Sequence, residues 1–140
     1  MVRVYLPLDP TALETLRQRG EVGPVPVEAH AAAETEGRTS GKDDEEREYA
    51  AWSAAAADAV DRAPSGGRRV VASADVDTAV VRRMSAHATA VEIDAVVALS
   101  RIASFHIDEQ PGGDTADLLW YDVTELDDVI RLAAGARSGD

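Results

Sequence analysis

Apolar and polar residues alternate along several short segments of the chain, which is the pattern of β-strands with one buried face. The clearest is residues 2–8, where Val2, Val4, Leu6 and Leu8 share one side. Residues 118–121 are apolar on both sides, which predicts a strand in the middle of a sheet. The predicted strands are residues 2–8, 68–74, 91–93, 101–107 and 118–121.

Helical spacing of apolar residues, together with capping residues, predicts the helices. Asp9 and Pro10 are typical of a helix start, and Gly20 is typical of a helix end. The strongest pattern runs from residue 43 to residue 63, where an apolar stripe recurs at helical intervals. The predicted helices are residues 10–20, an alanine-rich helix at 28–34, 43–63, a short helix from Asp77 to residue 83, and a last helix that begins after Thr124.

This order of elements predicts an α+β fold. We expect a mixed or antiparallel sheet of four to five strands, with the helices packed on one face. The length of 140 residues indicates one domain, which we place at residues 1–134. Within it residues 35–43 are small and polar and predict a mobile loop. Residues 135–140 are expected to form a disordered tail.

The composition of the chain argues against several classes of function. The 26 acids and 14 bases give a net charge of −12, which repels nucleic acids and anionic membranes. The absence of cysteine excludes disulfides and thiol chemistry. Neither a signal segment nor a membrane span is visible, so we expect a cytoplasmic protein.

An acidic run at residues 43–48 includes Asp44, Glu45 and Glu48. These carboxylates could bind a cation or a basic partner. They also stand at a predicted helix start, where carboxylates stabilise the positive end of the helix dipole without any ligand.

Asp75 and Asp77 stand two residues apart at the end of a predicted strand. On a strand, two such carboxylates can face one way and hold Mg²⁺. Capping of a helix by Asp77 is the structural alternative. They are the candidate metal ligands of the chain, and no cofactor is expected.

A histidine with neighbouring carboxylates ends the strand at residues 101–107. His106 could act as a general base oriented by a partner such as Asp108. Asp75 and Tyr5 are the other candidates for such a site. A half-buried structural histidine explains the same pattern, and the chain lacks a nucleophile elbow and a zinc-binding helix motif.

Five short segments, taken in order, carry a resemblance to a known family: RVYLP at residues 3–7, DEEREYA at 44–50, RVVA at 69–72, RIASFHID at 101–108 and LLWY at 118–121. The chain resembles a family of small actinobacterial proteins that is designated only as a domain of unknown function. The resemblance implies an actinobacterial source and a cytoplasmic, stand-alone domain. It implies no activity, cofactor or catalytic residue.

Three hypotheses follow. The first is a non-catalytic acidic interaction protein, which binds an unidentified protein partner through Asp44, Glu45, Glu48 and Tyr121; its acidic surface favours a basic partner. The second is a small-ligand-binding protein or an enzyme with a site near His106 and Asp108. The third is a nucleic-acid mimic, although the acids cluster at helix starts and do not form a regular line. The sequence does not indicate the oligomeric state.

Overall fold

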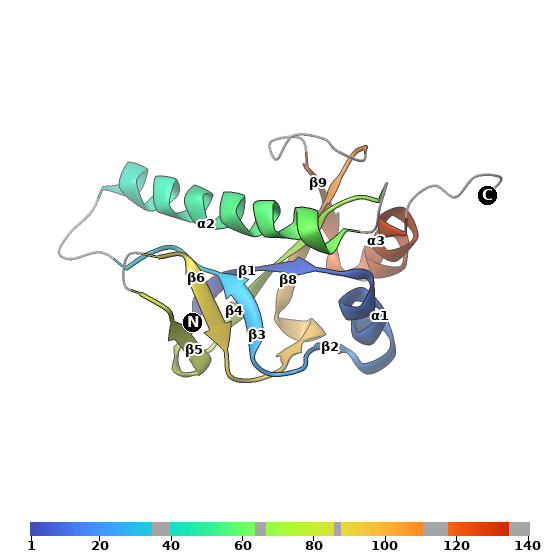
Figure 1. Cartoon of the computed structure of the whole chain (residues 1–140), viewed down its shortest axis with the longest axis horizontal. Helices are drawn as coiled ribbons and strands as arrows, with labels where there is room; N and C mark the ends of the chain where they lie inside the picture. Colours follow the sequence, from blue (N-terminus) through green and yellow to red (C-terminus); the bar gives the residue numbers. More distant parts are fainter. Residues whose placement is uncertain (35–39, 64–66, 86–87, 111–117, 135–140) are drawn as a thin grey trace.

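The computed structural model describes residues 1–34, 40–63, 67–85, 88–110 and 118–134. Seven strands within these ranges form one sheet in the order β5-β6-β3-β1-β4-β8-β9 (Figure 1). Every ladder between neighbouring strands is antiparallel. The strands are β1 (Val2–Leu8), β3 (Val27–His30), β4 (Val70–Val76), β5 (Val81–Arg83), β6 (Ala90–Ile93), β8 (Ile102–Asp108) and β9 (Leu118–Asp122). Separately, β2 (Glu21–Val22) pairs with β7 (Val97–Ala98).

Three α-helices accompany the sheet: α1 (Pro10–Arg19), α2 (Gly41–Arg62) and α3 (Leu126–Ala133). The start of α1 follows the prediction, because Asp9 Oδ1 accepts a 2.7 Å hydrogen bond from the backbone N–H of Ala12. Its end does too, since Gly20 adopts the left-handed conformation with φ of 70°. Short 3₁₀ turns are η1 (Thr78–Val80), η2 (Leu99–Arg101) and η4 (Val123–Glu125).

The alternation along β1 divides the core between the two faces of the sheet. Val4 and Leu6 belong to the larger buried cluster, which also contains Leu13 of α1 and Val129 of α3. Tyr5 points to the other face and packs against the smaller cluster, which contains three alanines of α2. In Figure 1, α2 runs along one side of the sheet, and α1 and α3 lie together at one end.

The α+β class is confirmed, but the predicted strand number is wrong, because the sheet has seven strands. The helices also divide between two faces instead of sharing one, as the two clusters indicate.

The additional strands are β3 and β5. Residues 27–30, part of which was predicted as helix, form β3 because they pair with β1 on one side and β6 on the other. Tertiary pairing overrides the helical preference of alanine there. The segment after Asp77 likewise forms only η1 before β5.

The predicted central position of residues 118–121 is also wrong, because β9 is the last strand of the sheet order and pairs with β8. Both faces of β9 are apolar because each packs against a different part of the core, and not because the strand is central. Leu118 packs with the α2 alanines, and Tyr121 packs against the larger cluster on the opposite face.

The predicted loop at residues 35–43 overlaps the start of α2. Ser40 caps this helix and Gly41 begins it, whereas residues 35–39 and the predicted tail at 135–140 lie outside the described residues. No helix in the described part of the chain is long and apolar enough to span a membrane.

Candidate functional site

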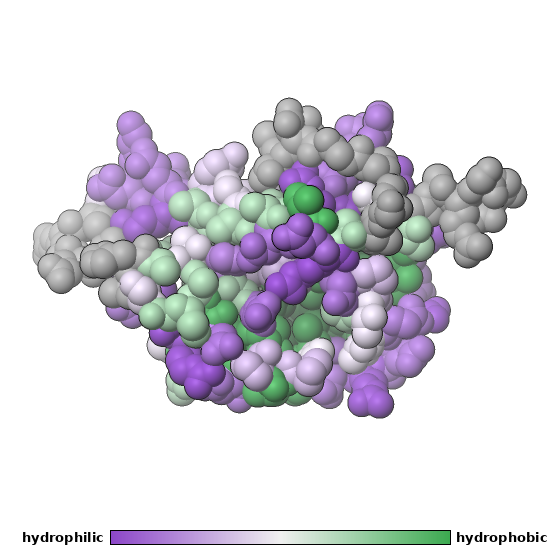
Figure 2. Space-filling view, viewed as in Figure 1, coloured by the Kyte–Doolittle hydropathy of each residue, from purple (hydrophilic) through white to green (hydrophobic). Residues whose placement is uncertain are grey.

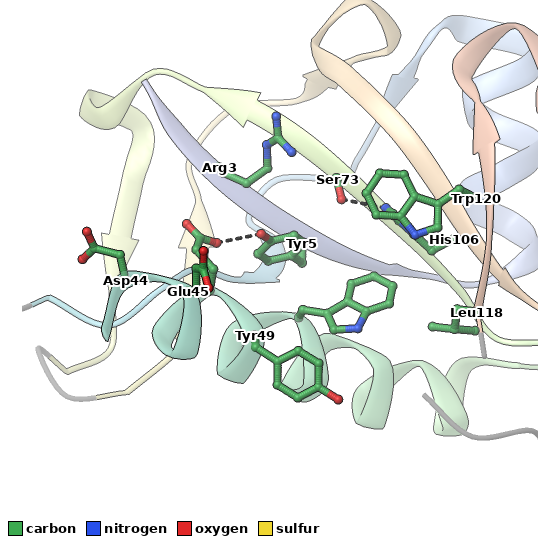
Figure 3. Close-up of a pocket in the computed structure, with 11 residues that line it drawn as sticks. Arg3, Tyr5, Asp44, Glu45, Tyr49, Ser73, His106, Leu118 and Trp120 are labelled. Carbon is green, nitrogen blue, oxygen red and sulfur yellow. Dashed lines mark hydrogen bonds between the residues drawn. The ribbon is translucent and has the colours of Figure 1, made fainter. Parts of the chain in front are cut away.

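A pocket of about 600 Å³ lies between the first half of α2 and the sheet face that α2 covers. The helix contributes Asp44, Glu45, Glu48, Tyr49 and Trp52. Four strands contribute Arg3, Tyr5, Ser73, His106, Leu118 and Trp120. Figure 3 shows these side chains between the helix and the strands.

Helical spacing brings the acidic and aromatic residues of α2 to one side. Glu45 and Tyr49 are four residues apart, as are Glu48 and Trp52, so each pair lies on neighbouring turns of the same face. Figure 2 shows hydrophilic residues gathered over the first turns of α2 and weakly hydrophobic ones farther along it. The carboxylates therefore stand at one end of the pocket, and aromatic and small residues follow.

Strand register assembles the opposite wall. Tyr5 of β1 lies beside Ser73 of β4, and His106 of β8 lies beside Trp120 of β9. Residues directly opposite one another in antiparallel strands point to the same face. Side chains from four separate segments therefore converge on this pocket.

The aromatic rings form a continuous row. The ring centroids of Tyr5 and Trp52 are 6.1 Å apart, those of Trp52 and His106 4.6 Å, and those of His106 and Trp120 4.4 Å. Each pair meets edge to face, which is a favoured geometry for aromatic rings. Trp120 at the end of the row is 76% exposed. An exposed ring of this size leaves a large apolar surface open to a binding partner.

His106 is held as a neutral ring. Its side chain lies between the two tryptophans and is only 2% exposed. Burial, with a contribution from the positive charge of Arg3, lowers the pKa of His106 to about 4. Its Nε2 lies 2.9 Å from Ser73 Oγ and 3.0 Å from Ser104 Oγ. Its Nδ1 has no hydrogen-bond partner among the described residues.

Tyr5 and Glu48 join the sheet to the helix. The Tyr5 hydroxyl donates a 2.6 Å hydrogen bond to Glu48 Oε2, as Figure 3 shows. Burial and this carboxylate raise the pKa of Tyr5 well above its ordinary value. The phenol therefore stays protonated and acts as a donor.

Asp75 does not line the pocket and is instead paired with Arg3. The Arg3 Nε donates to Asp75 Oδ1 at 2.8 Å, and its Nη2 donates to Oδ2 at 3.1 Å. These hydrogen bonds lower the pKa of Asp75 and raise that of Arg3. Asp77 instead caps η1, where its carboxylate accepts from the backbone N–H of Ala79. No group of three or more possible metal ligands occurs among the described residues.

Asp108 and Tyr121 also lie outside the pocket. Asp108 is buried and accepts hydrogen bonds from Arg69, with its Oδ1 2.7 Å from Nη2 and its Oδ2 2.9 Å from Nε. This ion pair connects β8 to the residue before β4. Tyr121 packs against the core on the opposite face of the sheet.

Of the candidate residues, the pocket thus unites Tyr5 and His106, which belong to the hypothesis of an enzyme or ligand-binding protein, with Asp44, Glu45 and Glu48, which belong to the hypothesis of an interaction protein. It also contains Arg3, Ser73, Tyr49 and the two tryptophans, which were not selected as site residues. The signal for Tyr49 and Trp52 was present: both follow the acidic residues at helical spacing. The positions of Ser73 and Trp120 depend on strand order, which has no local signal.

The arrangement is poorly suited to nucleophilic catalysis. Ser73 lies beside His106, but a histidine with a pKa near 4 is a weak base for a hydroxyl group. A catalytic histidine is also held by an acceptor at its other nitrogen, and no described residue accepts from Nδ1. The pocket can instead hold a flat or apolar group against the row of rings and meet it with carboxylates at one end.

Residues 2–130 match the model of a family of unknown function (DUF6912). No curated protein and no solved structure matches the chain.

Proposed function

Since the chain belongs to the DUF6912 family, whose description names no activity, we propose its function from the pocket itself: the protein binds a small organic molecule between α2 and the sheet and does not change it covalently. The observation that carries the proposal is the aromatic row in a pocket of about 600 Å³. That volume falls within the roughly 300–1,000 Å³ range of small-molecule sites.

The chemistry of the walls supports binding over reaction. Neutral His106 and protonated Tyr5 are poor proton acceptors at neutral pH. The rings, by contrast, offer contact surface that is already ordered by mutual edge-to-face packing. Preorganised surface of this kind binds a ligand with little loss of conformational entropy.

The tryptophans provide a direct test, because the chain has two and both line the pocket. The probes are phenethylamine, 2-phenylethanol and phenylacetate, which share one aromatic ring and differ in charge. Fragments of this size bind with dissociation constants of about 1 mM. We expect at least one probe to change the tryptophan emission in a saturable way.

A variant pair assigns the binding to the pocket. Trp120→Ala removes the exposed ring, and we expect it to weaken binding of the same probe about tenfold, measured by calorimetry. Leu119→Ala is the control, because the preceding side chain points to the opposite face of β9 and does not line the pocket. If no probe alters the emission up to about 10 mM, the proposed function is wrong.

A protein partner is the second candidate, favoured by the exposure of Trp120 (76%) and Tyr49 (57%) beside the acidic start of α2. A basic segment of such a partner would place a side chain in the same pocket. The actinobacterial source and the cytoplasmic location remain predictions from the sequence.

A further inference from the structure

The described residues that line the pocket carry more negative than positive charge. Among the lining residues that the structure describes, Arg3 is the arginine; two hydrogen bonds join it to Asp75, although its charge still acts on His106. At the helix end, Asp44 forms an ion pair with Arg47. Glu45 and Glu48 differ: within the described residues, neither forms an ion pair with an arginine, lysine or histidine. Arg3 attracts Glu48 through space without forming an ion pair with it, so the described part of the pocket contains two carboxylates outside any ion pair.

The carboxylate of Glu48 is also adjacent to the aromatic row. It accepts the 2.6 Å hydrogen bond from Tyr5, and the ring of Tyr5 packs against Trp52. Tyr5 donates a neutral hydroxyl, so the negative charge of Glu48 is retained. A positive group placed against these rings would lie within reach of Glu48.

Rings and carboxylates together select for one kind of charge. The faces of tyrosine and tryptophan rings are electron-rich and attract cations within about 6 Å of the ring centre. Carboxylates attract the same cations and repel anions. The net charge of −12 adds attraction at long range.

On the basis of the proposed function, we propose that the ligand is an organic cation, with an ammonium or guanidinium group on an apolar or aromatic body. The charged group lies by Glu48, Glu45 and the ring of Tyr5. The body of the ligand lies along Trp52 and Trp120, where the pocket is apolar.

The three probes named above test this charge preference on one ring scaffold. Phenethylamine is a cation at pH 7, 2-phenylethanol is neutral and nearly the same size, and phenylacetate is an anion. We expect the amine to bind about tenfold more tightly than the alcohol at low salt, and the anion to bind most weakly. Added salt should reduce the difference between amine and alcohol because it screens the carboxylates.

A matched pair of variants assigns the preference to the pocket. Glu48→Gln keeps the shape of the side chain and an oxygen that accepts from Tyr5, but it removes the charge. We expect about fivefold weaker binding of phenethylamine and unchanged binding of 2-phenylethanol. Glu46→Gln removes the same charge from an exposed position of α2 that does not line the pocket. It should change either affinity by less than about twofold.

The outcomes separate this inference from the proposed function. Equal affinity for the amine and the alcohol, or tightest binding of phenylacetate, overturns the cation inference and leaves the binding function standing. The same holds if Glu46→Gln and Glu48→Gln weaken amine binding equally. Absence of a response to all three probes overturns both.

Discussion

At the scale of single residues, His106 shows how environment decides chemistry. The sequence places it beside Asp108, as if the carboxylate could orient it. The two residues are two apart in β8 and therefore share a face of the sheet, but the carboxylate of Asp108 is engaged by Arg69. His106 is left with two serine hydroxyls and two tryptophan rings. The uncharged imidazole of His106 therefore lines the pocket.

The pKa of His106 predicts a pH dependence of stability. Its pKa is about 4 in the folded protein and 6.5 in the unfolded chain, so between these values the unfolded state binds the proton first. Stability from this residue is present above pH 6.5 and is lost as the pH falls toward 4. We expect the free energy of unfolding to decrease by about 2 kcal/mol between pH 7 and pH 5 on its account.

Urea unfolding at the two pH values measures this effect, with His106→Gln as the comparison. The variant keeps His30 and His87, so only the contribution of His106 is removed. The decrease in its free energy of unfolding between pH 7 and pH 5 should therefore be smaller than that of the unaltered protein by about 2 kcal/mol. A histidine NMR signal that is absent from the variant and titrates near pH 4 would identify the group directly. Identical pH dependence in the two proteins would contradict the assignment.

At the scale of elements, α2 combines two surfaces. Ala55, Ala56 and Ala59 are fully buried and pack with Val71 and Leu118, so the second half of the helix lies close to the sheet. The first half carries the larger side chains that line the pocket. Small residues at one end and large ones at the other thus position the helix over the strands and leave space for the pocket.

Enlarging a buried alanine tests this packing. Ala56→Leu inserts a bulky side chain where the exposed fraction is 0%, and we expect it to lower the free energy of unfolding by about 1–3 kcal/mol. The next residue provides the control, because Ala57 is exposed and Ala57→Leu should change stability by less than about 0.5 kcal/mol. Equal effects in urea unfolding would show that α2 is not packed as described.

At the scale of the whole molecule, the central strands belong to both cores. β1 contributes Leu6 to the cluster beneath α1 and α3, and Tyr5 to the cluster beneath α2. β4 does the same with Ala72 and Val71. Neither core can persist once these strands unfold, so the two faces depend on one another.

This shared sheet predicts one cooperative unfolding transition, as expected for a single domain. Tryptophan fluorescence reports the α2 face, where both tryptophans lie, and far-UV circular dichroism reports the backbone of the whole chain. We expect the two signals to give the same urea midpoint. A fluorescence change at clearly lower urea would show that α2 and the pocket unfold separately.

Much of the local structure was determined by the sequence alone. Residues 2–8 alternate and form β1, and Asp9, Pro10 and Gly20 begin and end α1 as predicted. These signals lie within a few residues of one another, since side-chain direction repeats every two residues in a strand and every three to four in a helix. The acidic and aromatic side of α2 could be identified in the same way.

Only the tertiary structure decided which segments are neighbours. The pairing of β3 with β1 and β6 makes a strand of the beginning of the segment predicted as an alanine-rich helix, and the edge position of β9 leaves Trp120 exposed beside His106. Strand order depends on how all the apolar faces are buried together, and that balance is not written in any short window of residues. The pocket therefore arises from register between distant strands, whereas its chemical character was already carried by the residues themselves.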